Sequence, residues 1–140
     1  MAYLSEILSM RLAIPKNHWD IDDDLDNFTY KAHINDRIAL IVDFDLMHDG
    51  GLEIVFDVIN PDKVKPTSRE VLVILNTVVS MVGHLLGKIE PDYIFYNPTT
   101  FSRAKLYDRI MKKYLHDIGY AFDDGARIPG LSMYKIYTRV

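Results

Sequence analysis

The chain of 140 residues contains no cysteine, which excludes disulfide bridges, thiolate zinc sites and a cysteine nucleophile. Its seven glycines form no glycine-rich phosphate-binding loop, and no Gly-x-Ser-x-Gly sequence marks a nucleophile elbow. The five histidines never stand four residues apart, so the helical zinc signature is also missing. The chain therefore lacks the common sequence signatures of metal, phosphate and nucleophile chemistry.

An excess of positive charge is lacking too, because 16 lysines and arginines face 20 aspartates and glutamates, for a net charge of −4. This balance argues against a general nucleic-acid surface. The first 19 residues have no basic start and carry Ser5, Glu6 and Arg11 in their apolar part, unlike a signal peptide or a membrane span. We expect a protein of a reducing compartment, with no nucleic-acid or membrane partner.

What is present is an ordinary globular composition, 49% hydrophobic and 26% charged, in a chain of the length of one domain. Apolar residues at helical spacing predict a short helix over residues 2–12, followed by a polar acidic connector over 15–27 that contains "DIDDDLD". We expect residues 1–140 to form a single domain, with 1–27 as N-terminal helix and connector and 28–140 as the core.

Apolar and polar residues alternate in three consecutive segments, which is typical of half-buried strands. The segments are residues 28–35, 37–46 and 52–59, and the "HDGG" turn at 48–51 carries a strong hairpin signal. They predict an antiparallel meander of three strands.

The second half of the sequence alternates between helix and strand signals. Thr67 followed by Glu70 matches a capping box, so a largely apolar helix should begin near Ser68 and end at Gly87. The run "DYIFYN" predicts an interior strand, "SRAKLYDRIMKKYLHDIGY" an amphipathic helix, and "GYAFD" and "SMYKIYTRV" two further strands around a loop at 123–130. The predicted class is α+β, with the order α-β-β-β-α-β-α-β-β.

The segment "LYDRIMKKYLHDIGY" resembles the signature on the last helix and strand of the GNAT superfamily of N-acetyltransferases. More narrowly, "TVVSMVGHLLGKIEPDYIFYNPTTFSRAKLYDRIMKKYLHDIGY" is similar to a group of small tailed-phage proteins that share a Thr-Val helix, an aromatic strand and Ser-Arg-x-x-Leu-Tyr. The resemblance covers about half of the chain. It implies a GNAT-like twisted, mostly antiparallel sheet with helices on both faces.

The same resemblance implies an acyl-CoA site with acetyl-CoA as cofactor. Tyr107 would be the acid that protonates the leaving thiolate, and the pyrophosphate would meet the helix start at Thr67, Ser68 and Arg69, where free N–H groups favour anions. The superfamily's phosphate loop contains glycines, whereas "NPDKVKPTSREV" has none and Pro66 removes a backbone donor. Tyr107 also shares an apolar stripe with neighbouring helix residues, so a purely packing role is the alternative.

The favoured hypothesis is a non-catalytic phage-type protein that binds another protein, phage or host, without a cofactor. It would be a virion or assembly component, or an inhibitor of a host system, located in the virion or the host cytoplasm, and a homo-oligomer stays open. Aromatic residues and arginine are enriched in interface cores. The candidate contact residues on this ground are Arg103, Arg109, Tyr134 and Tyr137. The competing hypothesis is an acyl-CoA-dependent N-acetyltransferase.

Two acidic groups invite a comparison with metal sites. The alternating aspartates at 20, 22, 24 and 26 resemble an EF-hand loop, but Leu25 stands where glycine is needed and Lys31 where glutamate is needed. A second group comprises Asp43, Asp45, His48 and Asp49. Exposed carboxylates on an amphipathic strand explain that group better, so we expect no metal.

Overall fold

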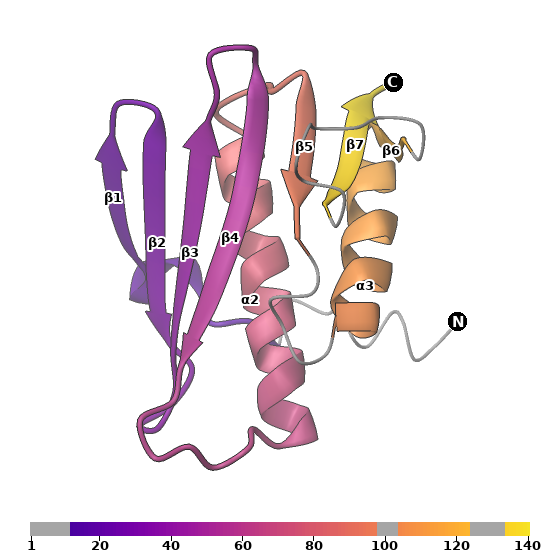
Figure 1. Ribbon diagram of the computed structural model, residues 1–140. Helices are drawn as coiled ribbons and strands as arrows, with labels where there is room; N and C mark the ends of the chain where they lie inside the picture. The colour runs from indigo at the N-terminus through magenta and orange to yellow at the C-terminus, as the bar shows by residue number, and fades with distance from the viewer. Residues whose placement is uncertain (1–11, 98–103, 124–133) are drawn as a thin grey trace.

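The computed structural model describes residues 12–97, 104–123 and 134–140, which form seven strands and two α-helices (Figure 1). The class is α+β, as predicted, with one open and mostly antiparallel sheet. The predicted helix at 2–12 lies outside the described residues except for its last position, and so does Arg103. The strand order is β1-β2-β3-β4-β5-β7-β6.

The first half of the sheet is a meander of four strands rather than three. Strands β2 (Asn27–His33), β3 (Ala39–Leu46) and β4 (Gly51–Ile59) match the predicted segments within a few residues. The prediction of a polar connector over 15–27 was wrong. This segment contains a short 3-10 helix, Lys16–His18, and a strand, β1 (Asp20–Asp24). Strand β1 pairs antiparallel with β2 and forms one edge of the sheet.

The second half of the sheet begins with a parallel pair. Strand β5 (Tyr93–Tyr96) runs parallel to β4, and the register joins only Gly51 to Tyr93, Leu52 to Ile94 and Glu53 to Phe95. Strand β7 (Lys135–Arg139) pairs antiparallel with β5, and β6 (Tyr120–Phe122) pairs with β7 as the opposite edge. The rest of β4 therefore continues beyond the end of β5.

Helix α2 (Ser68–Leu86) is the main apolar element of the core. Its capping box is formed as predicted, since the Thr67 side chain accepts from the Glu70 N–H and Gly87 caps the other end. Ten of its residues are buried, and each fully buried aliphatic side chain contributes about 1.5–3 kcal/mol. By length and composition α2 could also span a membrane, but more than half of it is buried inside the protein, as in the core helix of a soluble protein.

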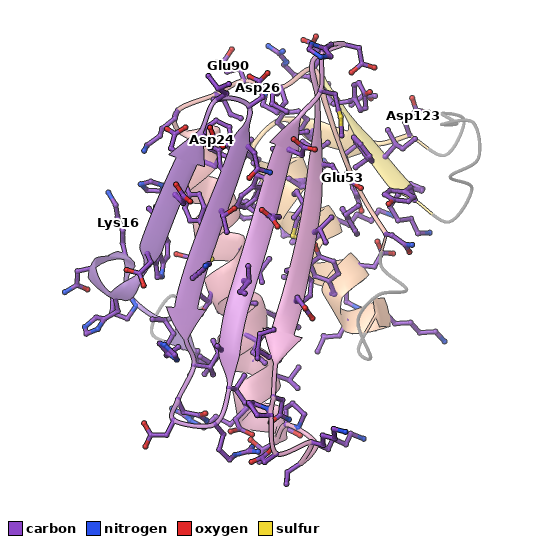
Figure 2. All side chains as sticks on the ribbon, turned by 60° about the vertical axis from the view of Figure 1, so that its left-hand side comes forward. Lys16, Asp24, Asp26, Glu53, Glu90 and Asp123 are labelled. Carbon is purple, nitrogen blue, oxygen red and sulfur yellow. The ribbon has the colours of Figure 1, made fainter. Side chains whose placement is uncertain are left out.

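The two helices that the structure describes both lie on one face of the sheet (Figure 2). The prediction of helices on both faces also included the helix at 2–12, which falls outside the described residues except for its last position. Tyr30, Val42 and Phe56 stand directly opposite one another on β2, β3 and β4. The Tyr30 hydroxyl lies 2.7 Å from Nδ1 of His84 on α2, and the Phe56 ring contacts Tyr107 on α3 (Ala104–Asp117). The other face of β1–β4 carries neither helix, and Figure 2 shows its side chains in front of the sheet with both helices behind.

Candidate functional site

Tyr107, the candidate acid, is buried in an aromatic cluster between α3 and the sheet. Only 2% of its surface is exposed, and its ring centroid lies 4.8 Å from that of Phe56 and 5.0 Å from that of Tyr96. Burial raises the pKa of its hydroxyl above the ordinary value. Edge-to-face and tilted aromatic contacts at these distances stabilise a folded core. The geometry is that of a packed tyrosine.

The place where β4 and β5 part is filled by the same aromatic side chains. Tyr96 donates a hydrogen bond of 2.8 Å to Asp108 on α3, and its hydroxyl lies 3.0 Å from that of Tyr137, whose ring stacks on it at 5.7 Å. Burial also raises the pKa of Tyr96. An acyl-CoA-dependent enzyme would keep an open cleft where these two strands part, whereas the described residues fill the space beside Phe56 with side chains.

The candidate pyrophosphate residues lie at the start of α2. The positive end of this helix already has an anionic partner from within the chain, the Glu70 carboxylate. Thr67, Ser68 and Arg69 are exposed, as a ligand site requires. The Glu70 carboxylate, however, accepts a hydrogen bond of 2.8 Å from the Thr67 N–H, which closes the capping box. An anion at a helix start is stabilised by the free N–H groups and the helix dipole, and here that anion is Glu70.

The Glu70 carboxylate is fixed by further donors from the β2–β3 turn. Asn35 donates at 2.6 Å and Arg37 at 2.8 Å, while Arg37 also pairs with Asp62 at 3.1 Å. The hydrogen bond from the Thr67 backbone, followed by that from Asn35, lowers the pKa of Glu70 to about 2. A pyrophosphate at this helix start would therefore meet a fixed negative charge and a missing donor at Pro66.

Replacing Glu70 by glutamine should remove a pH-dependent part of the stability. The folded pKa of about 2 lies below the ordinary 4.5, so the ionised group stabilises the fold above pH 4.5 and this contribution is lost as the pH falls towards 2. The wild type should be more stable than E70Q at neutral pH, and the difference should shrink over that interval. Urea denaturation across this pH range measures it.

A suitable control is Asp57→Asn, which removes the same charge from an exposed strand position. A constant difference between wild type and E70Q from neutral pH down to pH 2 would contradict the role assigned to the Glu70 carboxylate.

The predicted contact residues are spread over different parts of the molecule. Arg109 is exposed on α3. Tyr134 is half-buried, donates to Glu53 at 3.0 Å and contacts the Phe95 ring, so it lies on the side of the sheet opposite α2 and α3. Tyr137 was predicted to be a contact residue, but only 1% of it is exposed, because its ring stacks on Tyr96 in the core. Tyr137 is a core residue.

The acidic groups at the turns do not form a metal site in the described part of the chain, where no three potential ligands gather. Asp43 accepts a hydrogen bond of 2.7 Å from Thr29. Asp49 accepts from the Tyr93 hydroxyl at 2.6 Å and from the Gly51 N–H at 3.1 Å, and these two bonds lower its pKa. The second group of the sequence analysis therefore divides into separate local contacts.

Sequence reasoning missed the most distinctive surface, which we call the open face. It consists of the β1–β4 residues that point away from the helices, and it carries seven carboxylates and one lysine. The carboxylates are those of Asp20, Asp22, Asp24, Asp43, Asp45, Glu53 and Asp57, and the lysine is Lys31. Asp24 and Glu53 are labelled in Figure 2. The alternation of apolar and polar residues in β2–β4 could have indicated this face. Because β1 was predicted as a connector, however, the three acidic residues on β1 were not assigned to the sheet.

Apolar side chains lie among these charges. Val55 is 45% exposed and Ile59 38%, and half-buried Ile41 stands on the neighbouring strand. Asp45 and Glu53 stand directly opposite each other on β3 and β4, and like charges in that relation destabilise a sheet. The arrangement can attract a cationic surface and offers it an apolar centre.

Comparisons with protein-family models, with curated proteins and with solved structures find no match to this chain.

Proposed function

We propose that the chain is a non-catalytic, phage-type protein that binds a basic protein surface through its open face, on a scaffold resembling that of the acetyltransferases. The carrying observation is the open face itself, a sheet surface that neither described helix covers and that carries seven carboxylates and a single lysine. A protein with this role serves as a virion or assembly component, or as an inhibitor of a host system. Its partner is a phage or host protein.

The charge pattern supports binding rather than folding as the reason for these residues. Within the described residues, no ion pair involves Asp22, Asp45 or Asp57. The opposed pair of Asp45 and Glu53 even works against the sheet. Unpaired charges of one sign raise the rate of encounter with an oppositely charged partner and exclude acidic ones.

The apolar centre supports a contact of protein type. Val55 and Ile59 are among the most exposed large aliphatic side chains in the strands. Val55 lies between Glu53 and Asp57 and opposite Asp43, and Ile59 follows at the end of β4. Protein interfaces commonly combine a less charged centre with a polar rim. A basic protein with an apolar patch would match both parts.

The alternative, an acyl-CoA-dependent N-acetyltransferase, draws support from one feature. The β4–β5 pair is parallel and stops after three residue pairs, which is where a coenzyme would enter under the family resemblance. Against it stand the buried position of Tyr107 and the carboxylate of Glu70 at the start of α2. We therefore place the alternative second.

The proposal is tested by capture of partners from a bacterial lysate on the immobilised protein. The wild type is compared with D22N/D45N/D57N, in which three exposed carboxylates of the open face become amides of the same shape. The triple variant should retain at least about tenfold less of the captured protein, since each lost charge pair weakens binding. Raised salt should release the wild-type complex, because exposed charges are screened.

The matched control is D36N/E90Q/D117N, which removes three exposed carboxylates from other parts of the surface. It should capture the same proteins as the wild type. Equal capture by both triple variants and the wild type would contradict binding through the open face.

A further inference from the structure

The two-residue turn between β1 and β2 carries an unusual residue. Asp24 pairs with Asn27, so Leu25 and Asp26 make the turn, and Leu25 has a φ of 54°. Glycine, asparagine and aspartate suit such a conformation in a hairpin turn, whereas leucine in it costs about 1–2 kcal/mol. The Leu25 side chain is nevertheless 89% exposed. Neither local conformation nor burial accounts for a leucine at this position.

The tip of this hairpin is also strongly acidic. Exposed Asp23 and Asp24 precede Leu25, and exposed Asp26 follows it. An apolar side chain flanked by three carboxylates is the pattern of a segment that inserts into an apolar groove with a basic rim. A residue that breaks a local rule without stabilising its own fold is a candidate for a functional contact.

A groove of that kind lies at the other end of the sheet, between α3 and β6. It has a volume of about 490 Å³ and is lined by Arg109, Lys112, Lys113, His116, Ala121 and Phe122. Ala121 and Phe122 provide apolar surface from β6, and 38% of Phe122 is exposed. The amines of Lys112 and Lys135 lie 5.5 Å and 5.4 Å from the centre of the Phe122 ring.

The charges of this groove are the complement of those at the tip. Lys113 is paired with Asp117 at 3.0 Å, whereas within the described residues no ion pair engages Arg109 or Lys112. The amines of Lys112 and Lys135 lie beside the Phe122 ring, so an apolar side chain that enters next to Phe122 and Ala121 would bring its flanking carboxylates close to these cations. The groove therefore fits an acidic segment with one exposed apolar residue.

We propose that this segment is the β1–β2 turn of a second copy, so that Leu25 of one copy enters the α3–β6 groove of the next. Strands β1 and β6 are the two opposite edges of one sheet, so the tip and the groove of one molecule lie at opposite ends (Figure 1). Such a contact is heterologous, because different surfaces of the two copies meet, and it builds chains or rings rather than a twofold dimer. It does not depend on the open-face proposal.

The contact is small, so it belongs to the class of weak interfaces. Sedimentation velocity on the purified wild type, from roughly 20 μM to roughly 1 mM at low salt, should show a mass that rises with concentration beyond that of a dimer. Salt at about 0.5 M should reverse the association, since the charges at the contact are exposed. A wild type that stays monomeric over this range would overturn the proposal and leave the groove to an acidic ligand from elsewhere.

Two variants locate the contact. Leu25→Gly removes the side chain and suits the positive φ, so the hairpin should stay folded, while Lys112→Glu reverses a charge at the groove. Each should weaken self-association at least about tenfold. The control Val64→Gly removes another exposed aliphatic side chain and should associate like the wild type.

Mixing the two variants provides the sharpest outcome. L25G keeps an intact groove and K112E keeps an intact tip, so an equimolar mixture should form heterodimers that cannot grow further. Restored dimer in the mixture, with neither variant associating alone, supports the inserted tip. Association of L25G equal to that of the wild type would overturn it.

Discussion

Tyr107→Ala should lower the free energy of unfolding by about 3–5 kcal/mol, the usual cost of truncating a buried aromatic side chain. The ring of Tyr107 contacts those of Phe56 and Tyr96, and its removal leaves a cavity among rigid side chains. Tyr107→Phe keeps the ring and should cost no more than about 1.5 kcal/mol. Urea denaturation of both variants measures the two values.

Comparing Y107A with Y107F distinguishes a packing role of the Tyr107 ring from a role of its hydroxyl. If the ring matters, Y107F stays close to the wild type and Y107A does not. Equal and large losses in both variants would contradict the packing role, because they would place the stabilising interaction at the hydroxyl. A Y107A variant as stable as the wild type would show that the cluster around Phe56 is not part of the core.

Val78→Asp should destabilise the protein by at least about 4 kcal/mol, since it places an unpaired carboxylate in the interior. Val78 lies at the middle of α2 and is 0% exposed. A domain of this size is stable by only about 5–15 kcal/mol, so the variant should be largely unfolded or unfold at much lower temperature. Circular dichroism during heating measures the change.

Ser68→Asp is the matched control on the same helix. Ser68 is exposed at the first helical position, where a negative charge is favourable, so stability should change by less than about 0.5 kcal/mol. A V78D variant that unfolds like the wild type would contradict the burial of α2 against the sheet. It would also reopen the question of a membrane-spanning role for this helix.

The sequence was sufficient for those parts of the fold that depend on local patterns. Alternation located β2, β3 and β4, and Thr67 with Glu70 located the start of α2. Strand β1 was not predicted because all five of its residues are exposed, so its sequence shows no alternation of buried apolar and exposed polar residues. Strand β1 forms because it pairs with the free edge of β2, and this pairing cannot be read from the residues of β1 alone.

The candidate site depended still more on long-range contacts. Helical periodicity identified the apolar stripe that contains Tyr107, but not the sheet face against which it packs. The capping box was predictable, whereas the bonds from Asn35 and Arg37 to Glu70 join residues more than thirty positions apart. Tyr137 looked exposed because alternation does not show which face of a strand is solvated, and its ring in fact packs against Tyr96 in the core.

We propose that this scaffold binds protein and does not transfer acetyl groups, and titration calorimetry with acetyl-CoA distinguishes the two functions. We predict no saturable heat up to about 1 mM ligand and no rise in melting temperature. A dissociation constant near 10 μM would contradict the account, since 1 mM ligand, about a hundredfold excess over it, would stabilise the fold by about 2.7 kcal/mol. Binding that Arg69→Ala weakens would place the coenzyme at the start of α2 and make Tyr107 a catalytic candidate again.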